Sequence, residues 1–199
     1  MTDSVIGVGY LQLDIRFAAQ VSREPLGATE PIMGIAMDAP RDREGTLDRF
    51  RAGLAALEEV VSGLGDDALD TVPSGGGWSI RQIVHHVADG DDIWKLAIKM
   101  AVGNDGVEFV LGWYQSLTQM EWADRWAYSS RPIGASLSLL RSSREHVLQI
   151  LDHSPEAWNR AVLLRKPDGQ IERVPVGFIV EMQAEHVFHH LHRIQEILR

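Results

Sequence analysis

Six of the eight histidines fall in two short segments of the chain, and their spacing could support metal chemistry. The two segments hold His85, His86, His186, His189, His190 and His192. His146 and His153 stand apart and are interpreted as surface or packing residues. Because imidazole nitrogens are common ligands of zinc and nickel, the two clusters are the first candidates for a functional site.

His186 and His190 lie four residues apart on an expected C-terminal helix. Apolar residues recur along that helix at Val176, Ile179, Val187, Ile194 and Ile197. A rotation of about 100° per residue places His186 and His190 within this apolar stripe, one turn apart. The same rotation turns His189 and His192 toward solvent or a neighbouring chain.

The other pair lies on an expected helix with an apolar stripe of its own. His86 falls at the flank of that stripe, beside Ile83, whereas His85 is expected to point farther outward. Helical geometry therefore nominates three inward or half-inward imidazoles, His86, His186 and His190.

Three neutral imidazoles could share one divalent ion and leave a coordination position open, as reactive metal sites do. Zinc or nickel suits such ligands, whereas calcium and magnesium prefer oxygen. The alternative is that the histidines are hydrogen-bonded packing residues, and spacing alone leaves both interpretations open. The nearest carboxylates in sequence are Asp89 and Glu185. Asp89 is a candidate catalytic base or an orienting residue, and Glu185 is expected to point away from the stripe.

Four amphipathic helices must position these side chains. Apolar periodicity predicts them from Thr46 to the glycines at 63 and 65, from 78 to about 102, from about 133 to 151, and from Pro175 nearly to Arg199. Thr46 is expected to cap the first helix. Ser79 and Gln82 have the spacing of a capping box at the start of the second.

The predicted fold class is all-α, a four-helix bundle with an N-terminal extension at 1–45 and the bundle at 46–199. The connection 103–132 is long enough to let the second and third helices run parallel, in up-down-down-up order. It carries Trp113, Trp122 and Trp126, which either line the mouth of a pocket or fill a small core.

Two shorter segments have the patterns of strands. Residues 162–164 and 171–174 flank the turn sequence Pro-Asp-Gly at 167–169, which predicts a β-hairpin before the last helix. Within the extension, apolar and polar residues alternate over 11–17, so this arm could add a strand to a sheet or form a loosely ordered leader.

Composition excludes several classes of function. Nineteen basic against 28 acidic residues give a net charge of −9, which disfavours nucleic acid and anionic membranes as partners. The absence of cysteine excludes disulfides, thiolate metal sites and a thiol nucleophile carried by the chain. With no apolar run long enough to span a bilayer and no basic leader, a cytoplasmic location is expected.

Two motifs resemble those of a known family. Residues 76–89 read GGWSIRQIVHHVAD and residues 186–194 read HVFHHLHRI, and together they are similar to the signatures of the DinB/YfiT-like superfamily. The resemblance covers residues 46–199. It implies an up-down-down-up four-helix bundle, commonly a homodimer, with a divalent metal held by His86, His186 and His190. At position 193 this chain has Arg, where the family carries Gln or His. This departure bears on the hydrogen bonds around the metal or on contacts with the substrate, and not on the metal ligands themselves.

The resemblance also implies a class of activity. Members of the family are described as metal-dependent hydrolases or as S-transferases and isomerases that use a low-molecular-weight thiol. Both would act on a small-molecule substrate, and a thiol would have to be a cosubstrate because the chain has no cysteine. Two alternatives from other classes remain: a non-catalytic metal-binding module, and an interaction module whose histidines and N-terminal arm serve dimerisation.

Overall fold

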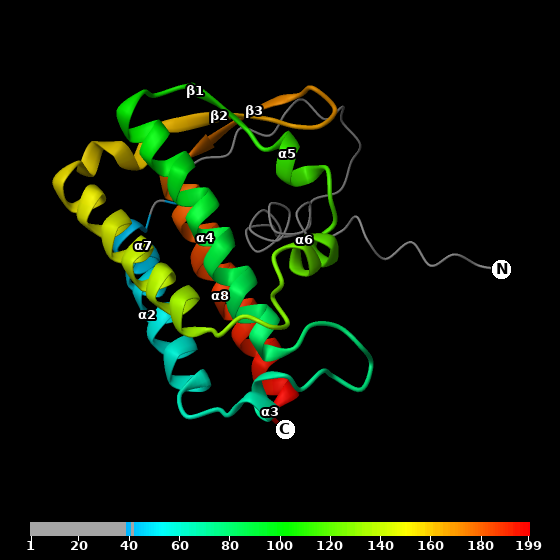
Figure 1. The fold of residues 1–199 in the computed structure, drawn as a ribbon. Helices are drawn as coiled ribbons and strands as arrows, with labels where there is room; N and C mark the ends of the chain where they lie inside the picture. The colour runs from blue at the N-terminus through cyan, green and yellow to red at the C-terminus, as the bar shows by residue number, and fades with distance from the viewer. Residues whose placement is uncertain (1–38, 41) are drawn as a thin grey trace, which may run out of the picture.

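Four long helices form the body of the structure, a computed structural model that describes residues 39, 40 and 42–199. They are α2 (Arg43–Val61), α4 (Ile80–Gly103), α7 (Gly134–His153) and α8 (Val176–Ile197). Helices α2 and α8 run in one direction, and α4 and α7 run in the other (Figure 1). The bundle and its up-down-down-up order are therefore as the sequence predicted. None of the described helices is long and apolar enough to cross a membrane.

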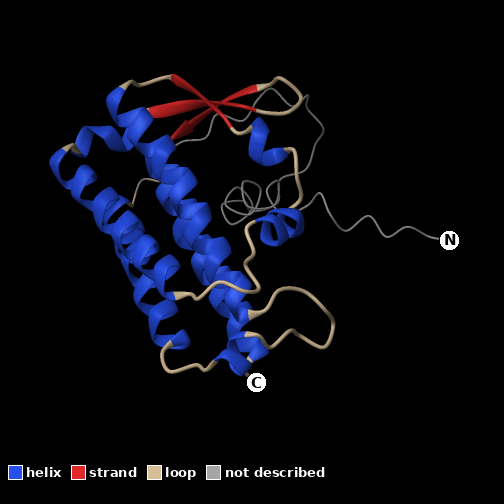
Figure 2. Cartoon of the chain, viewed as in Figure 1, coloured by secondary structure: helices blue, strands red, loops and turns tan. Residues whose placement is uncertain are grey.

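A small sheet and several short helices join the long ones. They are α3 (Asp66–Leu69), β1 (Val107–Val110), α5 (Gly112–Gln115), α6 (Gln119–Arg125), the 3-10 helix η1 (Pro155–Asn159), β2 (Ala161–Arg165) and β3 (Ile171–Pro175). The sheet lies at one end of the bundle (Figure 2). Strands β2 and β3 form the predicted antiparallel hairpin. Strand β1 pairs with β2 in parallel. This strand was not predicted, because its four residues show too little alternation of apolar and polar side chains.

The first helix begins three residues earlier than its apolar pattern predicts. Asp42 is the N-cap, and its carboxylate accepts a hydrogen bond of 2.9 Å from the backbone N–H of Gly45. Thr46 lies inside the first turn, so the prediction that it caps the helix was wrong. A carboxylate is favoured at this position because it also complements the positive end of the helix dipole. The alternating pattern at 11–17 lies outside the described residues.

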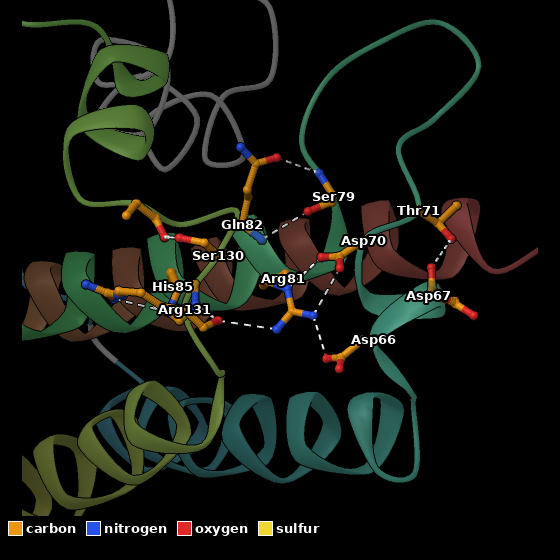
Figure 3. Close-up of polar contacts among 11 residues, drawn as sticks. Asp66, Asp67, Asp70, Thr71, Ser79, Arg81, Gln82, His85, Ser130 and Arg131 are labelled. Atoms are coloured by element: carbon orange, nitrogen blue, oxygen red, sulfur yellow. Dashed lines mark hydrogen bonds and ion pairs between the residues drawn. The ribbon is translucent and has the colours of Figure 1, made fainter.

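The start of α4 is held from two sides. Ser79 and Gln82 form the predicted capping box. Arg81 is buried, with its Nη2 2.7 Å from Asp66 Oδ1 and its Nε 2.6 Å from Asp70 Oδ1, so it attaches α3 to α4 (Figure 3). These contacts place the beginning of the helix that carries His86.

A polar layer divides the core of the bundle into two apolar clusters. One cluster packs beside the sheet and includes Phe50, Ile98, Leu151 and Ile179. The other lies toward the opposite end and includes Leu57, Val84, Leu140 and Ile194. On each long helix the boundary between the clusters falls about midway, and buried polar side chains from α4, α7 and α8 occupy this level.

Arg144 is the centre of this polar layer. Its guanidinium donates to Asp91 Oδ2 at 2.6 Å, to the carbonyl oxygen of Phe50 at 2.5 Å and to that of Gln183 at 3.0 Å. Arg144 belongs to α7, and these acceptors belong to α4, α2 and α8. One buried side chain thus connects all four long helices.

Candidate metal centre

Three histidines from two helices meet at one point. His86 lies on α4, and His186 and His190 lie one turn apart on α8. The Nε2 atom of His186 is 3.0 Å from that of His86 and 3.0 Å from that of His190. All three ligand atoms lie within 4.8 Å of one another. The structure therefore brings together the three imidazoles that helical rotation nominated.

The surroundings of His86 and His190 favour the neutral form of these two rings. His86 and His190 are buried, and His186 is half-buried. The ring of Trp78 lies edge-on to His86, at 4.5 Å between centroids, and stacks over His190 at 6.4 Å. Burial, followed by the neighbouring imidazole of His186, holds the pKa of His86 and of His190 well below its ordinary value. Both are thus present as the uncharged form that binds metal.

The donor set fits a divalent transition metal. Two imidazole nitrogens bound to one tetrahedral zinc ion would be separated by about 3.3 Å, which is close to the two spacings found here. The donors are all imidazoles, which suits zinc or nickel. In the described part of the chain, His190 Nδ1 is buried without a hydrogen-bond partner. Arg193, on the next turn, has only donor groups and supplies no acceptor for an Nδ1–H.

A cavity of about 30 Å³ lies against His86 and His186. This volume exceeds the space that one water molecule requires. Its other lining residues are largely apolar: Gly90, Asp91, Ile93, Trp94, Leu111, Tyr114, Met182 and Gln183. The site therefore combines nitrogen donors with a space in which the apolar part of a small molecule could bind.

His85 differs from its prediction, because its side chain is fully buried rather than directed outward. Its Nε2 is 3.0 Å from the carbonyl oxygen of Arg131 and its Nδ1 is 2.7 Å from Ser136 Oγ. Figure 3 shows His85 beside Arg131 of the crossing segment. The outer face of α4 is covered because the chain returns across it before α7 begins. Since a carbonyl oxygen only accepts, Nε2 carries the proton and Nδ1 accepts from Ser136.

The two candidate carboxylates have other partners. Asp89 Oδ2 accepts a hydrogen bond of 2.7 Å from the hydroxyl of Tyr128, and Glu185 Oε1 pairs with Arg49 Nη2 at 2.5 Å. Burial and the Asp89 carboxylate raise the pKa of Tyr128, so the phenol stays protonated. Neither carboxylate belongs to the histidine group or lines the cavity. The role of Asp89 as a base stays a prediction.

The tryptophans of the crossing segment form an aromatic cluster outside the cavity. Trp122 lies 5.7 Å from Trp113 and 4.7 Å from Trp126 between ring centroids. Tyr114 stacks on Trp122 at 5.4 Å and is the ring of this cluster that lines the cavity. Trp122 and Trp126 are half-buried and pack against the core, which was one of the two predicted uses, whereas Trp113 is 52% exposed at the edge of the cluster.

Sequence reasoning missed three residues around the site. Trp78 covers two of the histidines, and only the packing of α4 on α8 brings it there. Asp91 and Gln183 were detectable because each interrupts the apolar stripe of its helix. Gln183 lies three residues before His186, on the same helical face.

We expect the stability of the metal-free protein to fall as the pH is lowered below about 6.5. Unfolded histidines bind protons in that range, whereas buried His86 and His190 do not, because their pKa is held down. Proton uptake then favours the unfolded state, by up to about 1.4 kcal/mol per pH unit for each histidine. Urea denaturation in the presence of a chelator, between pH 7.5 and 5, measures this loss of stability. His190→Gln should make the free energy of unfolding depend less steeply on pH. An unchanged pH dependence in that variant would contradict a lowered pKa for His190.

Comparison with known proteins agrees with the architecture. The family model of the DinB superfamily matches residues 49–194. A Geobacillus kaustophilus protein, named as a proposed metal-dependent hydrolase, is 30% identical over 142 residues, which are 71% of this chain and 75% of that protein. A similarly named protein of Oceanobacillus iheyensis is 29% identical over 144 residues, covering 72% and 78% of the two chains.

Two solved structures have similar folds. YfiT from Bacillus subtilis, a proposed metal-dependent hydrolase with an unusual four-helix bundle topology, aligns with a TM-score of 0.67 and 21% identity over 87% of this chain and 93% of its own. A mycothiol-dependent maleylpyruvate isomerase aligns with a TM-score of 0.56 and 18% identity over 75% of this chain and 59% of its own. With its match to the family model over most of its length, this chain belongs to the DinB superfamily.

Proposed function

We propose that this protein is a metal-dependent hydrolase of a small molecule, with zinc or nickel held by His86, His186 and His190. The observation that carries the proposal is the convergence of three imidazole nitrogens beside a cavity with largely apolar walls. The proposed hydrolase activity of relatives about 30% identical supports the same reading.

Each part of the site has a chemical role in this proposal. A divalent ion bound there would polarise a carbonyl group and make water or a thiol a stronger nucleophile at neutral pH. The three imidazoles hold the ion, and Trp78 shields two of them from solvent. Trp94 and Met182 supply apolar contacts to the substrate. The Asp91 carboxylate is bound to Arg144, so we assign it a structural role.

Thiol transfer is the second candidate for the same site. The fold is shared with an isomerase that depends on mycothiol, and an external thiol is the only kind available to a chain without cysteine. The difference between the candidates lies in the nucleophile: water in hydrolysis, and a small thiol in transfer.

The test uses the full chain, stripped with a chelator and reloaded with Zn²⁺ or Ni²⁺. We expect one ion per chain, and metal-dependent turnover in a panel of esters and amides. A parallel panel combines small thiols with electrophiles, and activity confined to it would favour the transferase. In whichever panel shows turnover, the variant Asp89→Asn tests whether Asp89 acts as the predicted base.

Two results would contradict an enzymatic role. One bound ion without turnover in either panel would favour a non-catalytic metal-binding module. Failure to bind any ion would favour an interaction module. The homodimer and the cytoplasmic location stay predictions, which light scattering and cell fractionation can test.

A further inference from the structure

Gln183 lines the cavity beside the histidines and carries a buried carboxamide. The residue is 3% exposed and lines the cavity together with His86 and His186. Its Nε2 donates to the backbone carbonyl oxygen of Asp91 at 3.2 Å. Its Oε1 is buried, and nothing in the described ranges 39–40 and 42–199 donates a hydrogen bond to it.

The orientation of this carboxamide is determined by its neighbours. The carbonyl oxygen of Asp91 only accepts, so the amide must direct Nε2 toward it and Oε1 elsewhere. The backbone of Gln183 is held as well, because its carbonyl oxygen accepts from Arg144 Nη2 at 3.0 Å. Arg144 and Asp91 are themselves paired in the core. Oε1 is therefore a positioned acceptor rather than the end of a mobile side chain.

A buried acceptor without a donor destabilises the folded protein, and a ligand that supplies the donor removes that cost. The remaining walls of the cavity are mainly apolar. A molecule suited to this space has an apolar body and an N–H or O–H group placed near Oε1. An ester of the same shape has no such donor.

We propose that Gln183 Oε1 selects substrates that carry a hydrogen-bond donor, and that secondary amides are preferred over the corresponding esters. This inference rests on the proposed function, because it takes the three-histidine site as the place where the substrate reacts. Gln183 is a specificity-determining residue in this account. It recognises the amide N–H while His86 and His186 border the same cavity.

Two ligands of nearly identical shape test the inference without any substitution. N-methylbutyramide and methyl butyrate differ at one position, where an N–H replaces an oxygen. Titration of the metal-free protein avoids turnover, and the indole N–H signal of Trp94 in NMR spectra reports binding because Trp94 lines the cavity. We expect wild type to bind the amide about tenfold more tightly than the ester.

Gln183→Met keeps the approximate shape of the side chain and removes the acceptor. It should bind the two ligands with equal affinity and still take up one Zn²⁺ per chain. Gln149→Met is the matched control, because Gln149 is exposed on α7, and it should keep the tenfold preference. Spectra of both variants verify that they fold.

The outcomes separate this inference from the proposed function. Equal affinities in wild type, binding of neither ligand, or an undiminished preference in Gln183→Met would each overturn the role of Gln183, even if zinc binds. A tenfold preference that only Gln183→Met abolishes would support it. If that preference appears in a protein that binds no metal, the proposed hydrolase fails while the recognition of N–H donors stands.

Discussion

Replacing His186 with alanine is expected to lower the affinity for Zn²⁺ by about 100- to 1,000-fold. Zinc binding by four-ligand structural sites is worth about 10–16 kcal/mol, so one ligand accounts for roughly 3–4 kcal/mol. His186 is the best position for this test because its Nε2 lies 3.0 Å from both partner nitrogens. It is also less buried than His86 and His190, so its loss should disturb the fold least. Competition with a chromophoric chelator measures the affinity directly.

The matched control is His192→Ala. His192 lies on the same helix but is exposed, and its removal should leave zinc affinity within about twofold of wild type. Thermal unfolding provides a second readout, since a ligand at 1,000 times its Kd stabilises the native state by about 4 kcal/mol. Zinc should therefore raise the Tm of wild type and His192→Ala and have little effect on His186→Ala. Equal affinities in all three proteins would contradict the three-histidine site.

Replacing Arg144 with methionine is expected to lower the free energy of unfolding by about 3–5 kcal/mol. The side chains of Arg144 and Asp91 are each 1% exposed, so the substitution leaves a carboxylate buried without its partner. It also removes the donors to the carbonyl oxygens of Phe50 and Gln183. Urea denaturation of the metal-free proteins at pH 7.5 measures the change.

A surface arginine on the same helix is the control for Arg144. Arg141 pairs with Glu58 while 58% of its own side chain is exposed. Arg141→Met should cost less than about 1 kcal/mol, because exposed ion pairs contribute little. If Arg144→Met does not fold, the double variant Arg144→Met, Asp91→Leu should, since it removes both buried charges. Equal stability of the two single variants would contradict the importance of the polar layer.

Local sequence patterns identified the elements that carry the site. Apolar residues three and four apart marked the four long helices, and Ser79 with Gln82 marked the start of α4 correctly. These predictions succeeded because helix periodicity and capping depend on residues within one or two turns. Thr46 was the exception, since Asp42 offered a better cap four residues earlier.

The sequence by itself determined that His86, His186 and His190 face inward, because each position follows from rotation along a single helix. The tertiary structure alone decided that they share one point, that the crossing chain buries His85, and that Arg144 joins all four helices. It also decided that Gln183 lines the cavity and that its Oε1 is buried without a donor among the described residues. Such contacts join residues distant in the chain, so they depend on how the helices pack and not on the periodicity of any one of them.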